Sequence, residues 1–228
     1  KMKRRVIIVV CLRLEEGMTE RIRNFQACLA ALNDQTVERD RYEVWICEEG
    51  THPVANSCAD PLWDQYVFRY SDKPFNRSRA LNEGARATEA RAKDFICLMD
   101  ADLLVDWQWV KRMYRWAREY PVGMIPYQNV LYLDHYSTEY AIGARANNYM
   151  DLTLLTAERN SPNSVGGVIW IHSALYWHIG GHDEGYLGWG CEDMDFFFKL
   201  EAACRPKRLQ GVSLLHLNHP KVSKHPNY

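Results

Sequence analysis

Two carboxylates one residue apart, Asp100 and Asp102, form the first group in this sequence that could do chemistry. They follow the mostly apolar run Phe95–Met99, which predicts a short buried strand. A strand that ends in Asp-x-Asp places hard oxygen ligands at the edge of a sheet. Such ligands suit Mg²⁺ or Mn²⁺, especially when phosphate oxygens complete the coordination shell. The pair alone has little specificity, because aspartate is also common in turns.

A second feature is the segment 75–84, which reads Phe-Asn-Arg-Ser-Arg-Ala-Leu-Asn-Glu-Gly. Arg77 and Arg79 lie near the start of a helix-like stretch, and a guanidinium binds phosphate through its bidentate fork. The alternative role is structural, since solvated arginines at the start of a helix would give the same pattern.

The third feature is the stretch 180–195, which is glycine-rich and ends in Gly-Trp-Gly-Cys-Glu-Asp-Met-Asp. Glu192, Asp193 and Asp195 predict the first turn of a helix, where acidic residues suit the positive end of the helix dipole. That role alone would explain the three acids. The neighbouring glycines and Trp189 favour a loop that also binds a ligand.

Strands and helices that would position these groups alternate in the first half of the chain. Apolar, β-branched runs predict strands at Val6–Leu12, Tyr42–Cys47, Tyr66–Tyr70 and Phe95–Met99. Helical spacing predicts one helix capped by Thr19 and another over Ser78–Ala92. This alternation predicts a parallel sheet covered on both faces, with ligands beyond the carboxyl ends of its strands. Glu48 and Glu49 follow the second strand, so they fall at the same edge as the Asp-x-Asp pair.

The second half of the chain has a less regular pattern. Helices are predicted at 106–120, at 140–155 and from Cys191 onward, and strands at 122–127, 168–171 and 212–217. The last strand carries His216 and leads to His219. Aromatic and polar residues are mixed from 128 to 163, so this stretch gives little indication of its structure.

Composition sets broad limits on the class of protein. The chain has 228 residues, 47% hydrophobic and 25% charged, with a formal net charge of −1, which indicates a globular protein without a general basic field for nucleic acid. Its 7 cysteines form no Cys-x-x-Cys pair and favour reduced thiols. Apolar runs are far shorter than the roughly 18 residues that span a bilayer. A cytoplasmic protein is the simplest expectation, although a catalytic fragment of a larger protein would look the same.

Taken together and in their order along the chain, the three features resemble the sequence pattern of the nucleotide-sugar glycosyltransferases of the GT-A fold. The nearest likeness is to the β-1,4-galactosyltransferase and chondroitin-polymerase type, and to family-two enzymes more broadly. Gly-Trp-Gly-x-Glu-Asp-x-Asp at 188–195 is the most specific match. The resemblance implies an α/β, Rossmann-like fold, a mostly parallel sheet with helices on both faces. It also implies one domain over 1–228, with a nucleotide-binding half at 1–105 and an acceptor-binding half at 106–228.

The resemblance implies a divalent cation, Mn²⁺ or alternatively Mg²⁺, held by the Asp-x-Asp pair. Asp102 would be the direct ligand, and Asp100 would lie nearer the ribose of a bound nucleotide. His216 would be a further metal ligand from the last strand, with His219 as a competing choice. An imidazole among hard oxygens fits Mn²⁺ better than Mg²⁺.

For the donor, the resemblance implies a UDP-sugar. Glu48 or Glu49 would meet its uridine end, although most members of the broader group have aspartate there. Arg77 and Arg79 would hold the base or the diphosphate. Arg13, after the first strand, occupies a place where related chains also contact the nucleotide.

For the acceptor, the resemblance implies that Asp193 is the general base. Glu192 would orient the acceptor or donor sugar, Trp189 would offer a ring on which a sugar stacks, and Gly190 would let the loop fold over the donor. The family segment usually has a third glycine where this chain has Cys191 and an acidic residue where it has Met194. These departures lie beside the expected acceptor pocket.

These expectations describe a metal-dependent, inverting glycosyltransferase of the hexosyltransferase type. Two alternatives are a nucleotidyltransferase, which would normally show a glycine-rich phosphate loop after the first strand, and a non-catalytic carbohydrate-binding domain on the same fold. A glycan is the first expectation for the acceptor, with a small molecule or a nucleic-acid base as alternatives. The sequence names neither the sugar nor the oligomeric state.

Overall fold

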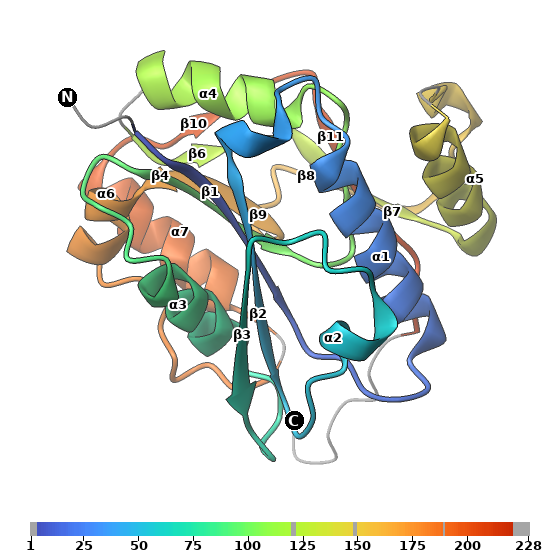
Figure 1. Ribbon diagram of the computed structural model, residues 1–228. Coiled ribbons are helices and arrows are strands. Elements are labelled where there is room, and N and C mark those ends of the chain that lie inside the picture. Colours follow the sequence, from blue (N-terminus) through green and yellow to red (C-terminus); the bar gives the residue numbers. More distant parts are fainter. Residues whose placement is uncertain (1–3, 120–121, 148–149, 189, 221–228) are drawn as a thin grey trace.

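A large sheet and a small sheet form the centre of the structure (Figure 1), a computed structural model that describes residues 4–119, 122–147, 150–188 and 190–220. The large sheet contains β1 (Val6–Leu12), β2 (Glu43–Gly50), β3 (Gln65–Tyr70), β4 (Phe95–Asp100), β6 (Met124–Ile125), β9 (Val168–His172) and β10 (Lys207–Arg208). Its strand order is β10-β6-β9-β4-β1-β2-β3. Strands β1 to β4 pair in parallel and β9 pairs antiparallel to β4, so the expected mostly parallel sheet is confirmed.

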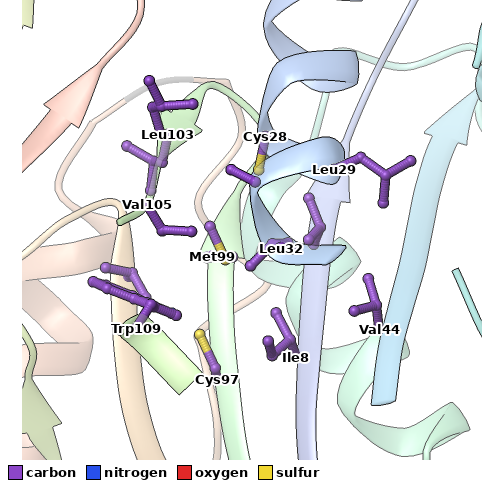
Figure 2. Close-up of a cluster of buried hydrophobic side chains, with 14 of the residues drawn as sticks. Ile8, Cys28, Leu29, Leu32, Val44, Cys97, Met99, Leu103, Val105 and Trp109 are labelled. Carbon is purple, nitrogen blue, oxygen red and sulfur yellow. The ribbon is translucent and has the colours of Figure 1, made fainter. Parts of the chain in front are cut away.

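Helices cover both faces of the large sheet, as the alternation of elements predicts. On one face lie α1 (Thr19–Asn33) and α4 (Trp109–Glu119); on the other lie α3 (Arg77–Ala87), α6 (Ser173–His178) and α7 (Glu192–Ala203). Successive residues of β1 point to opposite faces, so Ile8 packs with α1 and Val9 with α3. Figure 2 shows Leu29 and Leu32 of α1 in the first of these layers. Each such buried leucine contributes about 1.5–3 kcal/mol relative to an exposed one.

The contact between α3 and the sheet depends on Gly84. A Cβ atom on this residue would lie 2.5 Å from Val9 Cγ1 and 3.1 Å from Cys47 Cβ. Glycine therefore lets α3 approach β1 and β2 closely. The same helix carries Arg77 in its first turn, so the close approach keeps the helix that bears Arg77 against the sheet.

The small sheet has the order β5-β11-β7-β8, with β5 (Leu103–Leu104), β7 (Asn129–Leu133), β8 (Ala157–Pro162) and β11 (Ser213–His216). Strand β11 pairs antiparallel to β5 and parallel to β7. Strand β5 comes almost directly after β4, so the small sheet begins where the large sheet's central strand ends. The remaining elements are the short helix α2 (Ala55–Cys58), helix α5 (His135–Ala146) and two 3₁₀ turns (Arg39–Arg41 and Leu152–Leu154).

Several element boundaries differ from those expected. Thr19 is the first residue of α1 rather than its cap, because Met18 occupies the N-cap position without a side-chain hydrogen bond. Helix α3 ends at Ala87, not at residue 92, and the helix expected at 140–155 lies at His135–Ala146. Glu48 and Glu49 lie inside β2 rather than after it. Within the described residues, no helix is long and apolar enough to cross a membrane.

Candidate active site and metal centre

Asp102 and two histidines meet where the two sheets join. His219 Nε2 lies 3.0 Å and His216 Nε2 lies 3.6 Å from Asp102 Oδ2, and one ligand atom of each residue lies within 4.8 Å of the others. The pairing of β11 with β5 sets His216 opposite Leu103, and Leu217 N donates to Asp102 O at 2.9 Å. The chain thus holds both histidines beside the second aspartate of the Asp-x-Asp pair.

The chemistry of this triad fits a divalent cation. Asp102 Oδ1 is buried and has no hydrogen-bond partner, so a ligand atom is left to coordinate. Burial would raise the pKa of Asp102, but His216 and His219 outweigh it and lower the pKa, which keeps the carboxylate ionised. Burial lowers the pKa of His216, despite Asp102, and so favours the neutral imidazole that binds metal. One carboxylate with two imidazoles suits Mn²⁺ better than Mg²⁺.

Arg77 joins the other aspartate of the pair to the acidic start of α7. Its Nε lies 2.5 Å from Asp100 Oδ1 and its Nη1 lies 2.5 Å from Asp193 Oδ1. Glu192 Oε1 is 3.9 Å from the same Nη1. Burial raises the pKa of Asp100, and Arg77 opposes that shift. One guanidinium therefore ties the Asp-x-Asp pair to the expected base.

Two asparagines of the segment 75–84 hold the glycine-rich loop against α3. Asn76 caps α3 by accepting from Arg79 N at 2.8 Å, and its Nδ2 donates to Glu184 O at 2.7 Å. Asn82 Oδ1 accepts from His182 N at 3.0 Å, and its Nδ2 donates to His182 O at 2.9 Å. The sequence did not predict this role, because the loop partners lie 108 and 100 residues away along the chain.

The start of α7 is shaped by its own backbone and by Gly166. Cys191 precedes the helix with φ 68°, a left-handed conformation, and Glu192 Oε2 accepts from Gly190 N at 3.1 Å. A Cβ atom on Gly166 would lie 2.3 Å from Asp193 Oδ2, so only glycine leaves room for this carboxylate. Trp189 lies outside the described residues.

Glu48 and Glu49 both lie at the expected edge of the sheet, with side chains fully buried. Glu48 accepts from Ala55 N at 3.1 Å and from the Tyr66 hydroxyl. Glu49 pairs with Arg79 Nη2 at 2.7 Å. Glu48, Glu49 and Arg79 each bind a protein partner in this structure. Their expected contact with a donor therefore stays a prediction.

Arg13 follows β1 at the same edge, and its Nη1 donates to Lys73 O at 2.5 Å. Its Nε lies 3.1 Å from Glu15 Oε1. The structure thus does not bring Arg13 into contact with the Arg77 group, and its expected contact with the nucleotide stays a prediction.

Tyr132 and Arg159 extend the metal centre along the small sheet. The Tyr132 ring lies 4.6 Å from the His216 ring, and the Arg159 guanidinium lies 3.7 Å from the centre of the Tyr132 ring. Burial raises the pKa of Tyr132, to which Asp100, Asp102 and Asp193 also contribute. Both residues come from the stretch 128–163, whose pattern gave no signal.

Two families of known proteins match the sequence. The model of glycosyl transferase family 2 matches residues 7–180, and the model described as the N-terminal domain of galactosyltransferase matches residues 149–221. The first match spans β1 through α6 and includes Arg77, Asp100 and Asp102. The second includes Asp193, His216 and His219.

Solved structures share the fold at low sequence identity. The catalytic domain of Drosophila β1,4-galactosyltransferase 7 in complex with xylobiose matches with TM-score 0.50 and 18% identity, over 94% of this chain and 71% of that one. GalNAc-T7 with UDP, GalNAc and Mn²⁺ matches with TM-score 0.61 and 12% identity, over 97% and 45%. S. aureus TarS 1–349 matches with TM-score 0.59 and 10% identity, over 93% and 60%.

The expected GT-A fold is therefore confirmed by structures that resemble the chain over almost all of its length. The family match also confirms the class of enzyme that the sequence predicts, a glycosyltransferase. Because the family model covers most of the chain, including the Asp-x-Asp pair, the chain belongs to glycosyl transferase family 2.

Proposed function

We propose that this protein is a metal-dependent, inverting glycosyltransferase that moves a sugar from a UDP-sugar to an acceptor hydroxyl. One observation carries the proposal. Asp102, His216 and His219 form a site for a cation, and Arg77 connects the adjacent Asp100 to Asp193. The metal ligands and the candidate base thus belong to two neighbouring groups of side chains, which the Asp-x-Asp segment joins at the edge of the sheet.

Asp102, His216 and His219 would hold the cation, and Asp100 would face the ribose side of the nucleotide. Bound by these residues, a divalent cation would neutralise the diphosphate and would stabilise its charge as it departs. The first half of the chain, 1–105, would bind the nucleotide end of the donor. That part of the site would be lined or supported by Glu48, Glu49, Arg13 and Arg79.

Asp193 would act as the general base. It takes the proton of the acceptor hydroxyl while that oxygen attacks the anomeric carbon and the bond to the diphosphate breaks. Arg77 holds the Asp193 carboxylate in place through its 2.5 Å contact, and Glu192 would orient a sugar. Attack from the side opposite the diphosphate inverts the anomeric configuration without a covalent enzyme intermediate.

Known complexes of similar structures support the choice of ligands. GalNAc-T7 was solved with UDP, GalNAc and Mn²⁺, and the galactosyltransferase 7 catalytic domain with xylobiose. We infer Mn²⁺ as the cofactor, a UDP-sugar as the donor and a glycan as the acceptor. Trp189 and Gly190 would contact that acceptor together with Glu192.

The decisive experiment is a screen of UDP-sugars with Mn²⁺, in which released UDP is measured with and without candidate saccharide acceptors. Mn²⁺-dependent release of UDP, and a product with the inverted linkage by NMR, would support the proposal. Release of pyrophosphate would point instead to a nucleotidyltransferase. Sugar binding without any UDP release would point to a non-catalytic binding domain.

A further inference from the structure

Three neighbouring strands of the small sheet carry a row of side chains that starts at the metal centre. The pairing of β11 with β7 sets His216 opposite Tyr132, and the pairing of β7 with β8 sets Tyr132 opposite Arg159. Directly paired residues project from the same face of a sheet, so the three side chains lie side by side. The row therefore leads from a candidate metal ligand to the outer strand of the sheet.

Contacts between the side chains confirm this row. The rings of His216 and Tyr132 lie 4.6 Å apart, and the guanidinium carbon of Arg159 lies 3.7 Å from the centre of the Tyr132 ring. A cation over an aromatic face is held by the ring's quadrupole. Tyr132 thus fixes the position of the Arg159 guanidinium, and its ring contacts both Arg159 and the candidate metal ligand His216.

Arg159 is available to bind an anion. Its side chain is exposed, and among the described residues no carboxylate lies within ion-pair distance of it. Strand β8 is an edge strand, so no further strand covers it on its outer side. The packing against Tyr132 leaves the N–H groups at the rim of the guanidinium free to donate.

The negative charge of the candidate active site gives a positive side chain such as Arg159 a function there. Four carboxylates gather there, those of Asp100, Asp102, Glu192 and Asp193. The guanidinium of Arg77 is engaged with three of them, at 2.5 Å, 3.9 Å and 2.5 Å. Arg77 therefore offsets protein charge, and a donor diphosphate that enters this site needs a further positive group besides the cation.

We propose that Arg159, held by Tyr132, is a donor-binding residue that contacts the diphosphate of the UDP-sugar from the β8 side of the metal centre. This inference rests on the proposed function, because it takes a nucleoside diphosphate as the ligand. It assigns a phosphate contact to a residue that lies outside all three motifs of the sequence.

The test compares binding of UDP and of uridine, in the presence of Mn²⁺, by isothermal titration calorimetry. Arg159→Gln should weaken UDP binding about 10-fold, in the range of a lost charge-assisted hydrogen bond, and leave uridine binding unchanged. Arg159→Lys should recover part of the loss, because it restores the charge without the fork. Arg205→Gln, which alters an exposed arginine between α7 and β10, is the matched control and should bind UDP as the wild type does.

Tyr132 provides a second variant. Tyr132→Phe keeps the ring and should retain UDP affinity, whereas Tyr132→Leu removes the stacking surface and should weaken UDP binding several-fold. Circular dichroism and thermal melting of each variant check that the fold is intact, and Arg159→Lys keeps the test valid if Arg159→Gln folds poorly.

Each of the following results would overturn the inference. Unchanged UDP affinity in Arg159→Gln would do so, and an increase in acceptor KM alone would instead assign Arg159 to the acceptor. An equal loss of UDP and uridine binding would show a structural role. Failure of the wild-type protein to bind UDP with Mn²⁺ would overturn the proposed function and this inference together, whereas a failure confined to the variants concerns Arg159 alone.

Discussion

Arg77 Nη1 lies 2.5 Å from Asp193 Oδ1, so the candidate base is ion-paired to the first turn of α3, more than a hundred residues away in the sequence. The same side chain reaches Asp100 at the end of β4. A guanidinium can make both contacts because its donors project in a fixed fork. Arg77 therefore sets the position of Asp193 relative to the metal centre.

Asp193→Asn should abolish most transfer, because an amide cannot accept the acceptor's proton. We expect kcat to fall about 10²–10⁴-fold with little change in the KM for the donor. Steady-state UDP release at saturating donor measures this loss. Asp195→Asn is the matched control, since Asp195 lies on the same helix and pairs with Lys199 at 3.1 Å. Near-normal transfer by Asp193→Asn would exclude Asp193 as the base.

Arg77→Gln should destabilise the fold by about 2 kcal/mol, because it leaves partly buried carboxylates without their shared partner. The double variant Arg77→Gln/Asp193→Asn should lose less free energy of unfolding than the two single variants lose in sum. The reason is that one of the carboxylates is then neutral. Urea denaturation of the four proteins of this cycle measures the coupling. Strictly additive free energies would mean that the Arg77–Asp193 pair contributes nothing to stability.

Elements with a strong apolar pattern could be predicted from the sequence, and so could the position of the site at their ends. Strands β1 and β4 are buried along most of their length, so Val6–Leu12 and Phe95–Met99 have unbroken apolar runs. Asp100 and Asp102 lie at the end of β4, the edge that the alternation of strands and helices predicts, whereas Asp193 lies in the first turn of α7 and is joined to Asp100 through Arg77.

Strand β8 could not be predicted, because Ala157–Pro162 is a largely exposed edge strand with polar residues and a proline. Its existence depends on pairing with β7, a tertiary contact that leaves no periodic pattern. Similarly, the sequence placed Glu48 and Glu49 near the site but did not show their burial against Tyr66 and Arg79. Side-chain partners so distant in sequence have no local signature.

Removal of one histidine from the metal centre should weaken Mn²⁺ binding. His216→Ala and His219→Ala should each raise the Kd for Mn²⁺ at least about 10-fold, since each removes one of three ligands. The shift of the melting temperature with Mn²⁺ concentration measures this affinity without a sugar donor. His52→Ala is the control, because His52 is exposed, contacts Thr51 and is not part of the Asp102–His216–His219 group. A normal Mn²⁺ response in His219→Ala would leave His216 as the ligand that the sequence favours.

His182 should make the fold less stable in mildly acidic solution. Its ring stacks on Phe196 at 4.0 Å, and burial lowers its pKa well below 6.5. As the pH falls below 6.5, the unfolded chain takes up a proton that the folded chain excludes, so the free energy of unfolding decreases with falling pH. The slope from this group approaches about 1.4 kcal/mol per pH unit. Urea denaturation between pH 7 and pH 5 should show a shallower decrease in His182→Gln, and an unchanged slope would contradict the burial of a neutral ring.

Gly166→Ala should separate activity from stability. The new methyl group would lie 2.3 Å from Asp193 Oδ2, and the side chain of Asp193 can rotate away from it at small cost. Because rotation takes the carboxylate out of line with Arg77, we expect kcat to fall about 10–100-fold, whereas the free energy of unfolding should change by less than about 1 kcal/mol. The control is Gly143→Ala on α5, where a Cβ atom meets no neighbour within 4 Å and helix propensity favours alanine. Full activity in Gly166→Ala would mean that transfer does not depend on the position of Asp193 seen in this structure.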